Sequence, residues 1–229
     1  MPAKNVTKLY RKDSYYHLFN RGVEKRIIFQ DDQDYTVFTN YLRDYLTPKE
    51  ELIDALPQSS IVERIEREQQ ILRMNNFHNN ITLIAYCLMP NHFHFLVKQK
   101  EATAIHKFMI SLATRYTMYF NRKYDRVGSL CQGVYKGVLV DTAEQLLYLT
   151  RYIHIQALEL RNKGETFKTS QRSSYPVYLE KGKVGWIHPE EILGQFNQTS
   201  NPNNAYQDYV ETDVANEKYI DAIKDIQIE

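Results

Sequence analysis

Residues 86–97 read YCLMPNHFHFLV, two apolar runs joined by a Met-Pro-Asn turn. This pattern predicts a β-hairpin. Side chains on a strand alternate between its two faces, so His92 and His94 should share one face while Phe93 and Phe95 share the other. Two histidines on one face of so apolar a strand pack in the core, lie on a solvated face of the sheet or bind one divalent ion, and burying both without partners would be costly. A metal site would still need a third ligand from elsewhere in the chain.

The bulk composition is typical of a globular domain. The chain has 229 residues, of which 43% are apolar and 25% charged, enough for one sizeable domain with a core. Neither a membrane-spanning segment nor a signal peptide is apparent, and the two cysteines form no metal or disulfide pattern, so we expect a cytoplasmic protein. The net charge of +1 does not by itself indicate nucleic-acid binding.

Apolar spacing predicts further elements on both sides of the hairpin. They are a strand near residues 15–22, a helix that starts at Asp31–Asp32 and ends before Pro48, a helix over 102–123, a strand over 134–140 and a helix over 141–160. Asp141 should cap this last helix, with Glu144 completing a capping box. The order predicts an α+β domain in which helices pack on a central antiparallel sheet.

The domain boundaries follow from changes in composition. We expect a basic arm over residues 1–13 and a main domain over 14–160, with an inserted segment at 48–80. Residues 161–229 are rich in Lys, Gly, Ser and Asn, and they predict a loosely structured C-terminal appendage.

The last predicted helix carries the second informative pattern. Tyr152 and Gln156 are four residues apart, so they lie together on the helix surface, beside an apolar stripe that should face the sheet. The stripe consists of Leu146, Leu149, Ile153, Ala157 and Leu160. A hydroxyl and a carboxamide are therefore expected where the core meets solvent. A tyrosine at such a rim can also serve packing alone.

These motifs together resemble a known family. His92-Phe93-His94 resembles the His-hydrophobic-His motif of the HUH endonucleases, and residues 152–156 resemble the Tyr-x-x-x-Gln/Asn signature of single-tyrosine HUH transposases. Within that group the chain is similar to the REP-associated tyrosine transposases, over about residues 14–210. Further shared stretches are Asn20-Arg21-Gly22, residues 87–94, Arg115-Tyr116, residues 121–124, residues 151–154, Ser173-Ser174-Tyr175 and Trp186.

The resemblance implies a ferredoxin-like HUH fold and a metal-dependent activity. A relative of this kind would cut and rejoin single-stranded DNA at hairpins through a 5′-phosphotyrosine intermediate. Tyr152 would be the nucleophile, and His92, His94 and Gln156 would bind Mg²⁺ or Mn²⁺. The chain departs from the REP group in having Gln156-Ala157 where Asn-Pro is usual. Gln at this position keeps a side-chain carbonyl that can bind a metal. A second departure is the 48–80 segment, which is longer than the resemblance explains.

The implied partner is single-stranded or hairpin DNA, such as repetitive palindromic elements or transposon ends. Such a protein would be nucleoid-associated and would have no membrane partner, and family relatives often act as homodimers. Local basic residues offer phosphate contacts, although each alone is more simply a solvated surface charge. They are Lys8, Arg11, Lys12, Arg21, Lys25, Arg26, Arg115, Arg122 and Lys123.

Two other functions stay open at this point. One is a module derived from such a transposase that binds hairpin DNA or RNA without cutting it, although the intact set of His92, His94, Tyr152 and Gln156 argues against it. The other is a metal hydrolase that activates water and forms no covalent product. Tyr116 is the main rival nucleophile, but it falls on the apolar face of its helix.

Overall fold

The hairpin predicted around residues 86–97 is present in the computed structural model. Strands β2 (Ile81–Met89) and β3 (His92–Gln99) pair in antiparallel register, with Cys87 directly opposite His94. His92 and His94 consequently share one face of the sheet, as predicted. The structure describes residues 10–57, 60–162, 172–180 and 184–212.

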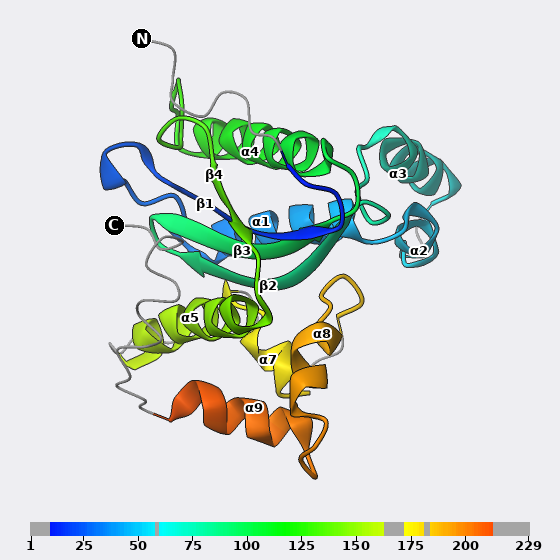
Figure 1. The fold of residues 1–229 in the computed structure, drawn as a ribbon. Helices are drawn as coiled ribbons and strands as arrows, with labels where there is room; N and C mark the ends of the chain where they lie inside the picture. The colour runs from blue at the N-terminus through cyan, green and yellow to red at the C-terminus, as the bar shows by residue number, and fades with distance from the viewer. Residues whose placement is uncertain (1–9, 58–59, 163–171, 181–183, 213–229) are drawn as a thin grey trace.

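Two further strands complete a four-stranded sheet. Strand β1 (Ser14–Arg21) pairs with β3 on one side and with β4 (Lys136–Val140) on the other, and every pairing is antiparallel. The strand order is β2-β3-β1-β4. Together with the chain order β1, α1, β2, β3, α4, β4, this is the ferredoxin-like arrangement. The predicted α+β class is therefore confirmed (Figure 1).

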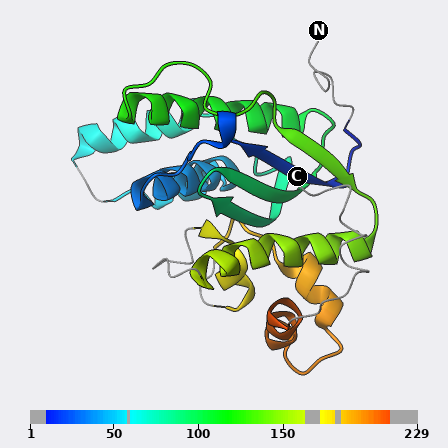
Figure 2. The same ribbon diagram turned by 90° about the vertical axis from the view of Figure 1, so that its left-hand side faces the viewer.

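Helices cover both faces of the sheet (Figures 1 and 2). Helices α1 (Asp32–Leu46) and α4 (Ala104–Lys123) pack on the face that carries Phe93 and Phe95, whereas α5 (Ala143–Asn162) packs on the histidine face. The predicted stripe of α5 is buried at Leu146, Leu149, Ile153 and Ala157. Within the described ranges, no helix has the length and apolar character needed to cross a membrane.

The starts of α1 and α5 test the predicted caps. Asp31 caps α1 as expected, because its Oδ1 accepts a hydrogen bond from the backbone N–H of Asp34 at 3.0 Å. The cap predicted for α5 is wrong by one residue. Thr142 Oγ1 accepts from the N–H of Gln145 at 3.0 Å, and the Gln145 side chain accepts from the N–H of Asp141 at 3.0 Å. Two capping-box sequences overlap here, one from Asp141 to Glu144 and one from Thr142 to Gln145, and the second caps the helix.

The 48–80 segment forms two helices beside the sheet, α2 (Lys49–Asp54) and α3 (Ile61–Arg73). They contact each other and lie together at one side of the molecule (Figure 1). The apolar residues on one side of α3 are largely exposed, with Ile61 at 79% and Val62 at 66%. The segment is therefore a peripheral helical pair that leaves the sheet intact.

The C-terminal region requires a correction. Its described part is not loosely structured but forms α7 (Tyr175–Tyr178), α8 (Glu190–Leu193), the 3₁₀ helix η2 (Gly194–Phe196) and α9 (Pro202–Glu211). Tyr178, Ile192 and Tyr206 are completely buried, in one apolar cluster with the inner side of α5. Widely spaced aromatic residues supply this layer, so its apolar character is hard to see in a mainly polar sequence. The proposed boundary at residue 160 stays a prediction.

Gly22 is required where β1 ends, and this leads to a prediction about stability. An added Cβ would collide with the carbonyl oxygen of Arg26 and would lie 2.9 Å from Cγ2 of Ile28. We expect Gly22→Ala to lower the free energy of unfolding by about 1–3 kcal/mol, as overpacking does. Gly185→Ala is the control, because no atom of the described residues beyond its chain neighbours lies within 4 Å of its added Cβ. Thermal unfolding should show a lower Tm for Gly22→Ala only, and equal Tm values would contradict the close approach.

Candidate functional site

The two predicted histidines lie beside each other on the α5 side of β3. Their ring centroids are 5.0 Å apart and the rings are nearly perpendicular. His94 is completely buried, whereas His92 is half-buried near the turn that opens the strand. Because side chains alternate between the faces of β3, both imidazoles lie on the same face at the N-terminal end of the strand.

A third histidine, which the sequence did not indicate, supports His94. His17 on β1 is completely buried, and its Nε2 lies 2.9 Å from Nδ1 of His94. The other ring nitrogen of His94, Nε2, is buried and has no hydrogen-bond partner in the described part of the chain. A buried polar atom without a partner is costly, so this nitrogen is a natural position for a ligand.

His92 is oriented in a similar way by its neighbour Asn91. Nδ1 of His92 lies 2.6 Å from Oδ1 of Asn91. Because an amide oxygen can only accept, Nδ1 carries the hydrogen and the neutral ring keeps a lone pair on Nε2. Hydrogen bonds of this kind to the second ring nitrogen are usual for histidines that bind metals.

The surroundings keep both rings neutral. Burial, with a smaller effect from the nearby Arg21 charge, lowers the pKa of His92 to about 4. Burial, followed by the proximity of His17 and His92, holds the pKa of His94 well below its usual value. A neutral imidazole is the form that binds a metal ion, because its lone pair is then available.

Tyr152 lies directly against His94. It projects from α5, is half-buried, and packs its ring perpendicular to the imidazole with the centroids 5.5 Å apart. The helix bearing this hydroxyl therefore docks beside the histidine strand. The tyrosine and the histidine pair belong to one site.

Gln156 is one helical turn further along α5 and is also half-buried. Strands β3 and β4 run in the same direction, since both are antiparallel to β1. Helix α5 starts shortly after β4 and returns across the sheet, so it runs opposite to β3. The step from Tyr152 to Gln156 therefore follows the direction from His94 towards His92.

Helix α5 is held from outside by the C-terminal layer. His154, between Tyr152 and Gln156, is completely buried, with Nδ1 2.7 Å from the Tyr206 hydroxyl and Nε2 2.8 Å from Ser174 Oγ. Burial lowers the pKa of His154 to about 3, so this ring is neutral. Both of its nitrogens are already bonded within the fold, which makes it a structural clamp and not a further ligand.

The rival nucleophile Tyr116 is in the opposite core. It is 3% exposed, and its hydroxyl donates to the carbonyl oxygen of Ile28 at 2.6 Å. Burial, with a further contribution from Asp34, raises the pKa of Tyr116. A buried phenol with a satisfied hydroxyl serves packing.

Some of the predicted DNA-binding residues lie near the histidine end of the sheet. Arg21 is directly opposite His92 across the β1–β3 ladder, and its Nε donates to Oε1 of Gln132 at 2.8 Å. Lys25 and Arg26 follow in the loop after β1, where Lys25 is exposed and Arg26 is half-buried. These three residues flank the strand end that carries His92.

The other predicted basic residues are not gathered there. Arg11 and Lys12 form exposed ion pairs with Asp141 at 3.4 Å and Glu101 at 3.0 Å, and Lys8 lies outside the described residues. Helix α4 carries the remaining three on the other side of the sheet. There Arg115 pairs with Asp44 at 3.2 Å, Lys123 contacts both Asp31 and Asp34 at 2.7 Å, and Arg122 is exposed.

The donor set near Tyr152 differs from a closed structural metal centre. Among the described residues, no group of three or more His, Cys, Asp or Glu side chains is arranged to hold a metal ion. The two histidines nevertheless fit a cation, because His94 Nε2 is buried with no partner in the part of the chain that the structure describes, and His92 presents a lone pair. Two nitrogen ligands leave positions for an amide oxygen and for a substrate.

Comparison with known proteins gives one family and distant structural likenesses. Residues 59–156, less than half of the chain, match the family described as "Transposase IS200 like". The range includes His92, His94, Tyr152 and Gln156 but not His17. Comparison with curated proteins gives no match.

Two solved structures have partial similarity. A REP-associated tyrosine transposase bound to a REP hairpin is 10% identical with a TM-score of 0.44, covering 81% of this chain and 90% of that one. The other structure is of a protein from Deinococcus radiodurans R1 that was named as a transposase. It is 15% identical with a TM-score of 0.37, and the match covers 67% of this chain and 98% of that one. Similarity at this level is distant, so the roles proposed below depend on the residues of this chain.

Proposed function

We propose that the chain is a metal-dependent endonuclease and strand transferase for single-stranded DNA, because residues 59–156 match the IS200-like transposase family. Its substrate is a DNA hairpin with single-stranded flanks, and the reaction proceeds through a 5′-phosphotyrosine. One observation carries the proposal. The half-buried Tyr152 packs on His94, whose buried Nε2 has no partner in the described part of the chain.

His92, His94 and the side-chain oxygen of Gln156 are the ligands we propose for one Mg²⁺ or Mn²⁺. Nitrogen donors with an amide oxygen and open positions suit a catalytic ion. When bound, such an ion polarises a phosphate and offsets the negative charge gained in the transition state. His17 and Asn91 are positioning residues, because they hold the second nitrogen of each imidazole.

Tyr152 is the nucleophile in this proposal. Its phenolic oxygen attacks phosphorus, forms the tyrosine–phosphate bond and displaces the 3′ oxygen, which leaves as a hydroxyl after taking up a proton. An ordinary phenol has a pKa of about 10, so the attacking oxygen must lose its proton during the step. The covalent bond keeps the energy of the phosphodiester, so attack by another 3′-hydroxyl rejoins strands without ATP.

The substrate class is argued from charge and from the family. Arg21, Lys25 and Arg26 lie at the end of β1 near His92, where a strand entering the site would pass. The motif resemblance of His92-Phe93-His94 and of residues 152–156 implies a hairpin substrate, which makes hairpin DNA the natural first substrate to test. Arg115 and Lys123 are less suited to this role, since both are paired with carboxylates.

Covalent capture of DNA tests the proposed function. Wild-type protein is incubated with Mn²⁺ and a labelled hairpin that has single-stranded flanks, and the products are separated after denaturation. We expect a labelled protein–DNA adduct that disappears when EDTA replaces the metal. Cleavage with only free DNA ends would instead favour a hydrolase that activates water. Tight hairpin binding without any cleavage would favour a non-cutting binding module.

A further inference from the structure

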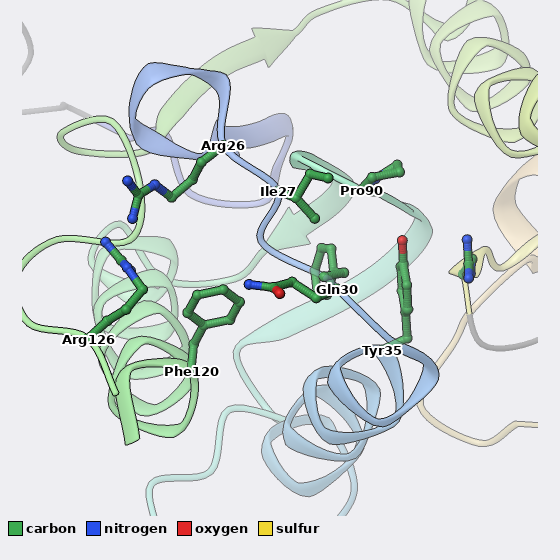
Figure 3. A pocket seen from close by; sticks show the side chains of 9 residues that line it. Arg26, Ile27, Gln30, Tyr35, Pro90, Phe120 and Arg126 are labelled. Carbon is green, nitrogen blue, oxygen red and sulfur yellow. The ribbon is translucent and has the colours of Figure 1, made fainter. Parts of the chain in front are cut away.

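A pocket lined with arginines includes Pro90, in the β2–β3 turn two residues before His92. Its volume is about 630 Å³, and its lining includes Arg26, Arg126, Arg172, Gln30 and Ile27 (Figure 3). A cavity of this size holds about one nucleotide and is too small for a duplex. The three guanidinium groups give it a strong preference for anions.

Among the described residues, two of the arginines have no carboxylate to balance them. Figure 3 shows Arg26 and Arg126 converging at one end of the pocket. Nε of Arg26 is buried with no partner among the described residues, and Arg126 donates only to the neutral oxygen of Asn121, at 3.1 Å. Within the described ranges neither forms an ion pair, whereas Arg172 pairs with the exposed Asp32 at 3.4 Å. Two converging cations without a counter-charge are satisfied by an anion placed between them.

Aromatic rings at the base of the pocket hold these groups in place. The Arg172 guanidinium lies 4.0 Å from the centroid of Tyr35, and that of Arg126 lies 5.8 Å from the centroid of Phe120. Tyr35 and Phe120 are almost completely buried, so they offer little surface for stacking a base. The pocket is therefore suited to a phosphate group and is not built to read a base.

Hydrogen bonds join the pocket to the proposed metal site through the β2–β3 turn. The N–H groups of Ile28 and Phe29 both donate to the carbonyl oxygen of Pro90, at 2.8 and 3.0 Å. Asn91 bonds both sides, because its Nδ2 donates to the carbonyl oxygen of Lys25 at 3.3 Å while its Oδ1 holds the His92 ring. These hydrogen bonds hold the loop that carries Arg26 against the turn that precedes His92.

We propose that Arg26 and Arg126 form a phosphate-binding subsite for the single-stranded flank of the DNA, next to the scissile phosphate. This inference rests on the proposed single-stranded DNA substrate, and it adds the position at which the protein holds the single-stranded flank. The ligand is a backbone phosphodiester of a flexible strand, since only such a strand can bend its phosphate into a recess between half-buried side chains.

The test measures binding without cleavage, in EDTA. The probes are a fluorescent hairpin with single-stranded flanks of about six nucleotides at both ends and the same hairpin without flanks. The variants are Arg26→Gln, Arg126→Gln and their combination. Arg64→Gln, on the peripheral helix α3, is the control for loss of one positive charge.

We expect the double variant to bind the flanked hairpin about a hundredfold more weakly, whereas its affinity for the hairpin without flanks changes less than about twofold. The slope of log affinity against log salt should fall by about 0.7 for each lost phosphate contact, which a loss of folding alone would not produce. Arg64→Gln should change neither quantity.

Two outcomes would overturn the subsite. One is unchanged binding of the flanked hairpin by the double variant. The other is an equal loss on both probes, which would place the contact on the duplex. Either result can coexist with covalent capture by wild-type protein, so failure of the subsite and failure of the proposed reaction are separable.

Discussion

Tyr152→Phe is expected to eliminate the covalent protein–DNA adduct while leaving affinity for the flanked hairpin within about twofold of wild type. Phenylalanine keeps the ring that packs on His94 at 5.5 Å but has no oxygen with which to attack phosphorus. The measurement is denaturing electrophoresis of labelled DNA in Mn²⁺, together with anisotropy binding in EDTA.

Tyr148→Phe is the matched control, because this tyrosine is one turn earlier on the same helix. Its hydroxyl is bonded to Oε1 of Glu144 at 3.0 Å. It should form adduct at the wild-type rate. Adduct formation by Tyr152→Phe, or its loss in both variants, would show that the nucleophile lies elsewhere.

Removing the nitrogens of His94 should have the second large effect. His94→Phe retains a ring in a fully buried position but removes the buried Nε2 that is the proposed metal ligand. We expect strand cleavage at saturating DNA to fall at least about a thousandfold, because charge stabilisation by a metal is worth several kcal/mol in the transition state. Hairpin affinity in EDTA should be largely retained.

His17→Phe should have a smaller effect than His94→Phe and serves as the comparison for it. His17 supports the site through His94, with its Nε2 2.9 Å from Nδ1 of that ring, so its loss should weaken Mn²⁺ binding about 10–100-fold without preventing cleavage at high metal concentration. Should His94→Phe not fold, the half-buried His92→Ala variant tests the same point. Full cleavage by both His94→Phe and His92→Ala would show that the histidine pair is structural.

Local patterns were sufficient to predict the main elements of the fold. Alternation in residues 86–97 predicted the hairpin and the common face of His92 and His94, and helical spacing predicted the buried stripe of α5. These features depend on neighbours along the chain. The contact between Tyr152 and His94 was implied by the family resemblance and not by these patterns, because a buried stripe shows that a helix faces the sheet but not which strand it lies on.

Features that depend on distant parts of the chain were missed. His17 supports His94 only because Phe19 pairs with His94 across two strands, and this register cannot be read from either strand alone. The ion pairs of Arg115 and Lys123 join residues on different helices, so their charges appeared free in the sequence.

The most direct test of the central claim is the identity of the amino acid that is linked to DNA. Trypsin releases Tyr152 in the peptide YIHIQALELR, residues 152–161, which contains no other tyrosine. After covalent capture and nuclease digestion, mass spectrometry should find a nucleotide phosphate on this peptide and on no other. A nucleotide phosphate on the peptide of residues 116–122 would contradict the assignment of Tyr152 as the nucleophile. Cleavage of DNA with no modified peptide would contradict it as well.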